Sequence, residues 1–337
     1  MLSSSFNISP QISVVIPVYN TAETLLYRAL NSVLNQTFID FELILVNDCS
    51  TNAVPEILNN YAEKDNRIKI IHNQQRIDCP QSREAGLKQA KGSYILFADS
   101  DDWLKADMLE ELYNTAVNND LDIAYCDYYM TRNGNIEHIR QGGFVDKIDF
   151  CKRIFSHTTW GVVWNRLVKK TLYENIVFPV DFMHEDEVIM FQLLYFAQRV
   201  GYVEKPLYYY TFRSCFIYNF NRNKAFSGEE INLINGAYNN YSFIINFCKK
   251  NNSNLNIFEP QISDRLNEIK IWFAFKNRKM CFDLYPQSHR RIFNKSLNIS
   301  ELNKFRFFCK IYRLPFLPFW LWVKMKKIFK FLRLQLL

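Results

Sequence analysis

The eight cysteines of this 337-residue chain contain no Cys-x-x-Cys pair. Scattered cysteines of this kind indicate neither a zinc site nor a disulfide framework, and they fit a reducing cytosol. The first eleven residues are polar and uncharged, and they lack the apolar segment of a secretory signal peptide. We therefore expect the protein to stay in the cytoplasm.

Three common catalytic loops are also missing. No Gly-x-Gly-x-x-Gly follows the first expected strand, and the chain has no Walker loop and no Gly-x-Ser-x-Gly elbow. These absences weigh against a dinucleotide-binding Rossmann enzyme and a P-loop ATPase. Any phosphate must then be held by a metal ion and side chains rather than by a glycine-rich backbone.

The composition is that of a folded protein with two differently charged parts. A hydrophobic content of 48% and an aromatic content of 16% exclude disorder, and the length allows one large domain or two ordinary ones. Residues 1–214 carry 20 Lys and Arg against 27 Asp and Glu, whereas residues 215–337 carry 21 against 7. This asymmetry favours chemistry in the first part and an anionic partner for the second.

Short apolar runs alternate with amphipathic segments through the first 130 residues. Expected strands lie at 12–18, 41–46, 68–72, 93–98 and 122–129, and expected helices at 22–36, 54–64, 81–90 and 106–118. A helix at 185–197, a strand at 202–211 and a long helical part from about 224 follow. The pattern predicts an α/β fold with a mainly parallel sheet, in which ligands bind at the carboxyl ends of strands. We expect one crevice there, lined by Tyr19, Asn20, Asn47, Asp48, Asn73 and Asp99 to Asp102.

Asp99-Ser100-Asp101-Asp102 is the most informative stretch, because it follows the apolar run 94–98 directly. Three carboxylates at the end of a buried strand repel one another and lose hydration. A hard divalent metal that bridges a diphosphate would offset this cost. The alternative is a polar turn that caps the next helix, and we expect Asp102 to be a supporting residue or such an N-cap.

Four segments resemble, in order and spacing, the family 2 glycosyltransferases: Val14-Val15-Ile16-Pro17-Val18-Tyr19-Asn20, Leu45-Val46-Asn47-Asp48-Cys49-Ser50-Thr51, Asp99-Ser100-Asp101-Asp102 and His184-Glu185-Asp186-Glu187. The resemblance covers about residues 11–215 and is closest to bacterial enzymes that extend lipooligosaccharide, capsule or similar surface glycans. It implies the GT-A (nucleotide-diphospho-sugar transferase) fold and inversion at the sugar carbon. The implied GT-A domain is 1–215, with a nucleotide-binding half at 11–130 and an acceptor half at 131–215. A helical extension follows at 216–337.

The resemblance also implies how the donor, a UDP-sugar, is held. Tyr19 would stack on the base, and the Asp48 carboxylate would accept a hydrogen bond from its imide N–H. Asp101 would bind Mn²⁺ or Mg²⁺ on the diphosphate, and Asp99 would take part in the metal site, through a water on the metal, or hold the ribose. The full set implied to contact the nucleotide sugar is Pro17, Tyr19, Asn20, Asp48, Arg83, Asp99 and Ser100.

Acidic residues at the start of the helix at 185–197 have two interpretations. They could simply complement the helix dipole. The resemblance instead implies that Asp186 is the general base, with Glu185 as its neighbour or alternate. A base beside other acids would have a raised pKa, which suits proton removal from an acceptor hydroxyl. We expect His184 and Trp164 to contact the acceptor saccharide, although Trp164 is equally compatible with a core position.

The loop before Arg83 departs from the family pattern. Asp78 stands where a glycine is usual and Glu84 where an asparagine is usual. The change at Asp78 admits a different loop backbone and a different donor preference.

The C-terminal tail, residues 303–337, predicts membrane association. Lys324, Lys326, Lys327, Lys330 and Arg333 lie between apolar residues in its last part, which has no acid. Lysines interrupt every apolar run, which excludes a spanning helix, and the pattern fits an amphipathic helix on an anionic membrane. A terminal helix packed on the domain is the alternative, and nucleic acid is a poorer match.

Together these patterns predict an inverting, metal-dependent transferase of a hexose or N-acetylhexosamine. The acceptor is a saccharide or lipid-linked saccharide at the inner face of a bacterial membrane, and a homo-oligomer is compatible with the sequence. The alternative is a catalytically silent nucleotide-sugar-binding or scaffold protein of a glycan assembly complex. A third hypothesis is a nucleotidyltransferase, and the missing glycine-rich phosphate loop is evidence against it.

Overall fold

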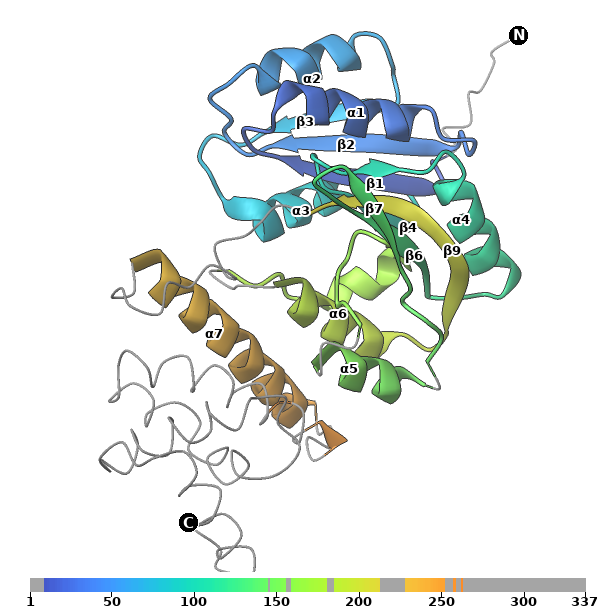
Figure 1. Cartoon of the computed structure of the whole chain (residues 1–337), viewed down its shortest axis with the longest axis vertical. Coiled ribbons are helices and arrows are strands. Elements are labelled where there is room, and N and C mark those ends of the chain that lie inside the picture. The colour runs from blue at the N-terminus through green and yellow to red at the C-terminus, as the bar shows by residue number, and fades with distance from the viewer. Residues whose placement is uncertain are drawn as a thin grey trace, which may run out of the picture. The chain divides into compact units, whose positions relative to one another are not determined.

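The structure is a computed structural model that describes residues 9–144, 146–155, 159–180, 185–212, 228–251, 257–258 and 262. The chain divides into two compact units (Figure 1). The first comprises Met1–Phe150, Thr159–Asp181 and Glu185–Tyr218, and the second Cys151–Thr158, Phe182–His184 and Asn219–Leu337. The domain boundary expected at 215/216 lies outside the described residues, as does the basic tail at 303–337.

The first unit is built on one sheet, which has nine strands in the described part of the chain. Their bounds are β1 (Ile12–Val18), β2 (Phe41–Asn47), β3 (Ile68–His72), β4 (Tyr94–Phe97), β5 (Trp103–Leu104), β6 (Ile123–Arg132), β7 (Asn135–Ile139), β8 (Arg166–Lys169) and β9 (Val200–Thr211). The order is β3-β2-β1-β4-β8-β6-β9-β5, with β7 paired to β6. Strands β3, β2, β1 and β4 are parallel to one another, and so are β6 and β9, whereas β8 runs antiparallel to both of its neighbours.

The helices in the described part of the chain are α1 (Glu23–Leu34), α2 (Val54–Ala62), α3 (Asp78–Gln89), α4 (Met108–Asn118), α5 (Lys147–Phe155), the 3₁₀ helix η1 (Lys170–Asn175), α6 (Glu185–Phe196) and α7 (Gly228–Lys250). Helices α1, α2 and α3 connect the parallel strands β1 to β4, as the sequence predicts. The α/β class is confirmed. Strands β5, β7 and β8 and helix α5 were not expected, because each is short or lies where the hydrophobic period is irregular.

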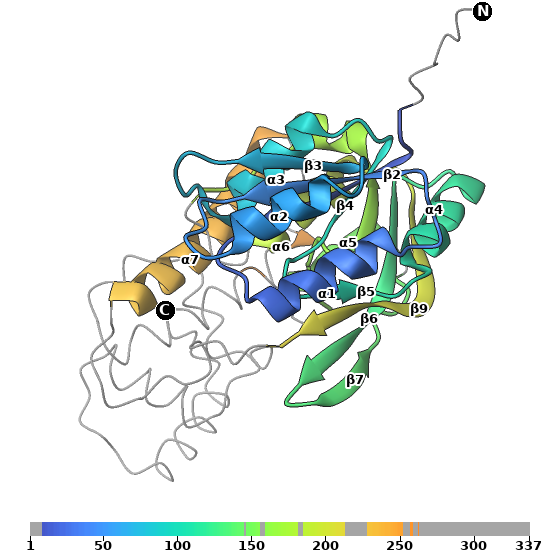
Figure 2. The ribbon, with the colours of Figure 1, turned by 90° about the horizontal axis from the view of Figure 1, so that it is seen from above.

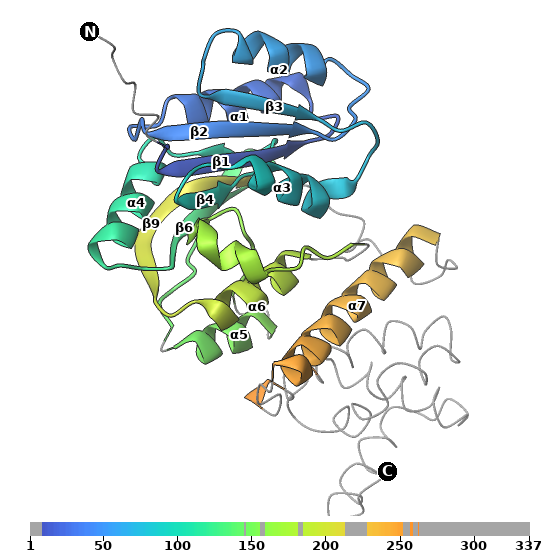
Figure 3. The same ribbon diagram turned by 180° about the vertical axis from the view of Figure 1, so that it is seen from behind.

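Both faces of the parallel part of the sheet are buried, which explains its continuous apolar strands. On one face Val14 and Ile16 pack in a core with Leu26 and Leu30 of α1. On the other face α3 lies against β1 and β2, and Figure 3 shows it in front of β1 and β4 while α1 lies behind the sheet. The β6–β7 hairpin projects away from these helices (Figure 2).

The second unit contains α7, and its described side chains include a small buried cluster. Tyr241, Ile244 and Cys248 of α7 are buried. The rings of Phe155 and Tyr241 lie 6.2 Å apart, and those of Phe155 and Phe258 lie 5.9 Å apart. In the part of the chain that the structure describes, no helix has the length and apolar character needed to cross a membrane.

Gly86 allows α3 to approach the sheet closely, and its replacement gives a test of this packing. A Cβ at this position would lie 2.3 Å from Val15 Cγ1 and 3.1 Å from Val46 Cγ2. Both are stiff, β-branched residues of buried strands, so we expect Gly86→Ala to cost about 1–3 kcal/mol of overpacking. Against the gain of about 1 kcal/mol in helix propensity, the midpoint of this range leaves a net destabilisation of about 1 kcal/mol.

The free energy of unfolding, measured by urea titration, checks this expectation. Gly143→Ala is the matched control, because no atom lies within 4 Å of the position of its Cβ. A Gly86→Ala variant as stable as the wild type would contradict the close contact between α3 and β1.

Candidate active site

The carboxyl ends of β1, β2 and β3 bring the first predicted site residues together. Val18 pairs with Asn47 and Asn47 with His72, so the residues that follow these strands are neighbours. The Asp48 N–H donates to the Val18 carbonyl at 2.9 Å. Pro17 lies buried within β1 beyond Val15, where the pairing with β4 ends, so its missing N–H interrupts no described pairing with that strand.

The Asp48 carboxylate organises the loop that leads into α3. It accepts hydrogen bonds from Asn73 Nδ2 and from the backbone N–H groups of Ile77 and Asp78, each at 2.9 Å. Asp78 has φ of 67°, in the left-handed region that glycine favours and aspartate tolerates. The replacement of the usual glycine by Asp78 therefore does not require a different loop backbone.

Tyr19 lies at the same edge with 41% of its surface exposed. The Arg76 guanidinium lies 4.3 Å from the centre of its ring, and Arg76 also forms an ion pair with Asp78 at 2.8 Å. Nearby, the Asn20 side chain accepts a hydrogen bond from the Thr51 N–H at 2.8 Å. The Tyr19 ring, which is expected to stack on a nucleobase, is thus partly exposed to solvent. The Arg76 guanidinium stacks on the ring.

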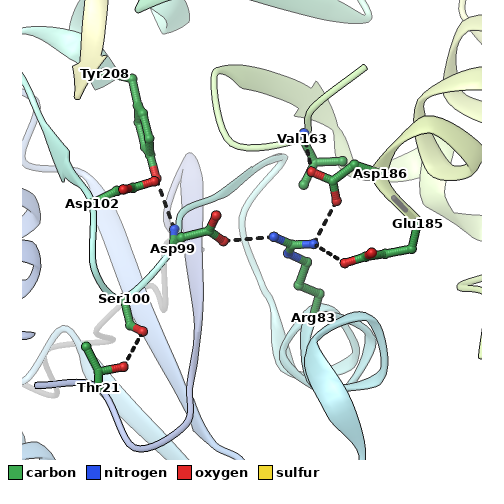
Figure 4. Close-up of polar contacts among 9 residues, drawn as sticks. All are labelled: Thr21, Arg83, Asp99, Ser100, Asp102, Val163, Glu185, Asp186 and Tyr208. Atoms are coloured by element: carbon green, nitrogen blue, oxygen red, sulfur yellow. Dashed lines mark hydrogen bonds and ion pairs between the residues drawn. The ribbon is translucent and has the colours of Figure 1, made fainter. Parts of the chain in front are cut away.

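The aspartate run after β4 separates into residues with different environments (Figure 4). Asp102 is 1% exposed, and its carboxylate accepts hydrogen bonds from the Tyr208 hydroxyl at 2.9 Å and the Thr211 N–H at 2.6 Å. Burial raises the pKa of Asp102 well above its usual range, and the charges of Asp99 and Asp101 raise it further. Ser100 pairs its hydroxyl with that of Thr21 at 2.6 Å.

Asp102 is therefore a supporting residue that ties the aspartate run to β9. The alternative interpretation as an N-cap is wrong, because β5 follows Asp102 directly and α4 begins only at Met108.

Arg83 joins the aspartate run to the acids of α6. The side chain is 3% exposed, and its guanidinium contacts Asp99 at 2.8 Å, Asp186 at 2.8 Å and Glu185 at 3.4 Å. Figure 4 shows the guanidinium between these three carboxylates, which come from the end of β4 and the start of α6. The sequence predicts that Arg83 contacts the nucleotide sugar, and in the structure both of its terminal nitrogens are occupied by carboxylates.

One cation does not fully compensate three carboxylates, and the pKa values reflect this. Burial, together with the charge of Asp186, raises the pKa of Glu185 to about 7. Burial also raises the pKa of Asp186, against the stabilising charge of Arg83 and a hydrogen bond of 3.2 Å from the Val163 N–H. Burial lowers the pKa of Arg83, but the charges of Cys79 and the three carboxylates outweigh burial and raise this pKa well above its usual value. Carboxylates poised in this way suit general-base chemistry.

Trp164 does not lie where a sugar could stack on it. It is 2% exposed, and its ring stacks on Tyr208 at 4.5 Å and on Tyr210 at 5.3 Å between centroids. The expectation that Trp164 binds the acceptor is wrong, because strands β6 and β9 enclose its ring in the core. His184, the other residue expected at the acceptor, lies outside the described residues.

The carboxylates available for a divalent metal are few. Within the described ranges no group of three or more His, Cys, Asp or Glu residues could hold a metal ion. Asp102 is committed to Tyr208 and Thr211, and one oxygen of Asp99 contacts Arg83 at 2.8 Å, so a metal at the end of β4 would take at most Asp99 and Asp101 from the aspartate run. One or two carboxylates fit a Mg²⁺-like ion that takes its other ligands from water and a bound diphosphate.

Three groups that support this site were not predicted from the sequence. The Tyr208 hydroxyl supports Asp99 and Asp102, the Val163 N–H contacts Asp186, and Arg166 lies buried behind Val163. Only Trp164 marked this region in advance, and nothing in the sequence assigned a role to a backbone N–H.

Comparisons with known proteins agree with this geometry. The model of the family described as "Glycosyl transferase family 2" matches residues 13–184. A putative glycosyltransferase of Bacillus subtilis, EpsH, is 34% identical over 243 residues, which are 68% of this chain and 69% of EpsH. The glycosyltransferase GlyA of Streptococcus pneumoniae is 31% identical over 61% of this chain, but the match spans only 31% of GlyA.

Solved structures show the same fold. The crystal structure of residues 1–349 of S. aureus TarS has a TM-score of 0.58 and 21% identity, and the match covers 89% of this chain and 81% of that one. TarS in complex with UDP-GlcNAc has a TM-score of 0.57 and 20% identity, with 91% and 93% covered. These similarities support the GT-A fold expected from the sequence.

The raised pKa of Glu185 predicts a pH dependence of stability. The folded protein holds a proton on this group up to about pH 7, whereas the ordinary carboxyl releases it near 4.5. The stabilising contribution is therefore complete below about pH 4.5 and is lost as pH rises through about 7. As pH rises from about 4.5 to about 7, we expect the free energy of unfolding to fall less in Glu185→Gln than in the wild type.

Thermal unfolding midpoints measured across this pH window check the expectation. The surface variant Glu84→Gln is the control, since Glu84 pairs only with exposed Lys88 among its described ion pairs. Equal slopes for the wild type and Glu185→Gln would show that Glu185 titrates like an ordinary carboxyl.

Proposed function

Because the chain belongs to glycosyl transferase family 2, we propose that it is an inverting enzyme that transfers a hexose or N-acetylhexosamine from a UDP-sugar to a saccharide. The observation that carries the proposal is the Arg83 cluster. A single guanidinium links Asp99, beside the donor edge of the sheet, to Glu185 and Asp186 at the start of α6.

The donor side supports a uridine nucleotide. Tyr19 presents an accessible ring, and the Asp48 carboxylate lies beside it at the ends of β1 and β2. A carboxylate oxygen has more than one acceptor direction, so Asp48 can accept an imide N–H while it holds the loop. The structural neighbour TarS forms complexes with UDP-GlcNAc and with UDP, which supports UDP as the carrier here.

Asp186 is a better general base than Glu185. Arg83 contacts one oxygen of Asp186 at 2.8 Å, and the Val163 N–H contacts the other at 3.2 Å. Arg83 contacts Glu185 at the longer distance of 3.4 Å, and the carboxyl also accepts a hydrogen bond from its own backbone N–H. The Asp186 carboxylate is thus held in one orientation by a contact to each of its oxygens, whereas Arg83 contacts Glu185 at one oxygen only. In this role it removes the acceptor hydroxyl proton as that oxygen attacks the sugar carbon opposite the departing UDP.

Asp101 and Asp99 would hold a divalent cation, Mn²⁺ or Mg²⁺, together with the donor diphosphate. Such an ion neutralises negative charge on the diphosphate as a Lewis acid. The residues of this chain contribute the rest: Asp102 and Tyr208 keep the aspartate run in place, and Arg83 neutralises the side of Asp99 that faces α6.

We place the reaction in bacterial surface-glycan synthesis, with a saccharide or lipid-linked saccharide as acceptor. The basic amphipathic pattern of the tail at 303–337 supports work at the cytoplasmic face of an anionic membrane. The relatives EpsH and GlyA, both glycosyltransferases of bacteria, are consistent with this setting. Membrane association of the tail and formation of a homo-oligomer are predictions from the sequence.

Replacement of the base tests the proposal directly. Asp186→Asn keeps the size of the side chain but cannot take a proton, so we expect kcat to fall by about 10²- to 10⁴-fold. The dissociation constant for UDP should change little, because Asp186 lies on the acceptor side of Arg83. The measurement is UDP release from a panel of UDP-sugars with saccharide acceptors, and Glu84→Gln is the control with unchanged activity.

Two outcomes would contradict the assignment. Full activity of Asp186→Asn would exclude Asp186 as the base. Tight UDP binding by the wild type, with no turnover on any donor and acceptor pair, would support a nucleotide-sugar-binding or scaffold protein instead.

The scarcity of carboxylates predicts that metal and donor bind together. We expect the affinity for Mn²⁺, measured by calorimetry, to rise at least about tenfold when UDP is present, because the diphosphate completes the ligand set. Asp101→Asn should remove most of this increase, whereas Asp107→Asn, a control at a partly exposed aspartate that pairs with Lys105, should not. Equal Mn²⁺ affinity with and without UDP would contradict the shared site.

A further inference from the structure

Arg166, at the start of β8, is the largest side chain that the described core buries completely. It is 0% exposed, and the centre of its guanidinium lies 5.4 Å from the Phe150 ring and 6.0 Å from the Tyr125 ring. Burial lowers the pKa of Arg166 to about 10, which leaves the group charged at neutral pH. Such a charge is costly to bury, so its hydrogen-bond partners explain its presence.

Those partners are carbonyl oxygens rather than carboxylates in the described part of the chain. The guanidinium donates to the Trp160 carbonyl at 2.9 Å, to the Val162 carbonyl and to the side-chain oxygen of Asn165. All three acceptors belong to the segment Trp160–Asn165, which precedes β8 directly. The Arg166 guanidinium therefore holds three oxygens of this segment close to one another.

One of these contacts reaches the candidate base through a single peptide group. The Val162 carbonyl and the Val163 N–H belong to the same planar unit, in which a trans peptide points the two groups in opposite directions. Arg166 holds the carbonyl, and the N–H donates to Asp186 Oδ2 at 3.2 Å. A donor on the carbonyl also polarises the amide and strengthens the hydrogen bond that its N–H makes.

The rest of the segment is anchored so that this peptide cannot easily turn. Asn165 is buried, donates its side-chain amide to the Cys126 carbonyl at 2.5 Å, and accepts the Cys126 N–H at 3.1 Å on its own carbonyl. Trp164 packs in the core beside Tyr208. The buried Trp164 thus fixes the segment rather than binding sugar.

We propose that Arg166 is a positioning residue for the base, and that it acts through the Val162–Val163 peptide to orient the Asp186 carboxylate. The inference rests on the proposed function, since it presumes that Asp186 takes the acceptor proton. Arg83 fixes one carboxylate oxygen from the donor side, and the Val163 N–H fixes the other from the opposite side. With both contacts in place, the carboxylate keeps one orientation toward an acceptor hydroxyl.

Kinetics of Arg166 variants test the proposal. Arg166→Met keeps much of the volume but removes the charge and the donors, and we expect kcat to fall by about 10- to 100-fold. The dissociation constant for the UDP-sugar should stay within about threefold, because the donor edge does not depend on this segment. Arg166→Lys, which restores the charge and one donor, should recover part of kcat. Lys169→Met is the control on the same strand, where the lysine pairs with Asp120 and Asp122 at the surface.

A second measurement does not depend on turnover. We expect the amide of Val163 to exchange with solvent faster in Arg166→Met than in the wild type, as measured by hydrogen exchange over residues 160–165. If the wild type transfers no sugar, the proposed function fails, while faster exchange at Val163 would still show that Arg166 holds the peptide.

A third variant covers the case in which Arg166→Met does not fold. Val163→Pro removes the N–H and leaves Arg166 in place, and we expect the same loss of kcat with retained donor binding. Unchanged kcat in a folded Arg166→Met or Val163→Pro variant overturns the proposal. So does a loss of kcat and donor affinity to the same extent, which would indicate general structural damage.

Discussion

The candidate site depends on one ion-pair cluster, in which the buried guanidinium of Arg83 faces the partly exposed carboxylates of Asp99, Glu185 and Asp186. A lone buried carboxylate would be expensive, and three together would repel one another. Arg83 offsets part of this cost, and the remainder appears as raised pKa values on the two acids of α6. Stability and base chemistry therefore share the same charges, and a change at any one of them alters the protonation of the others.

The sheet holds this cluster in place through polar residues that lie within its core. Tyr208 of β9 reaches the aspartate run, and Arg166 of β8 reaches Asp186 through the backbone of the preceding segment. Both residues follow from the order of the strands, because β8 and β9 continue the sheet beyond β4. Strands β8 and β9 thus support the acids of the site, whereas strands β1 to β4 carry the edge at which we propose that the donor binds.

The parallel half was predictable because its signals are local. Strands β1 and β3 have the expected bounds, and the residues after β1, β2 and β4 lie at one edge, since parallel strands end on the same side. The aspartate run was correctly placed at that edge, but the separate role of Asp102 needed Tyr208 and Thr211, which come from a strand more than a hundred residues later. The sequence allowed Trp164 either at the acceptor or in the core, and only the folded structure decided for the core, because burial depends on strands that are distant in the chain.

By itself, the sequence determined the α/β class, the family, and which acids belong to the motifs, because hydrophobic period and motif spacing act over a few residues at a time. Only the tertiary structure decided that Arg83 bridges the two groups of acids, that Trp164 is a core residue, and that a peptide N–H at Val163 contacts Asp186. These facts join segments up to 103 residues apart. Their free energies depend on burial and on distances between charges, and both quantities exist only once the chain has folded.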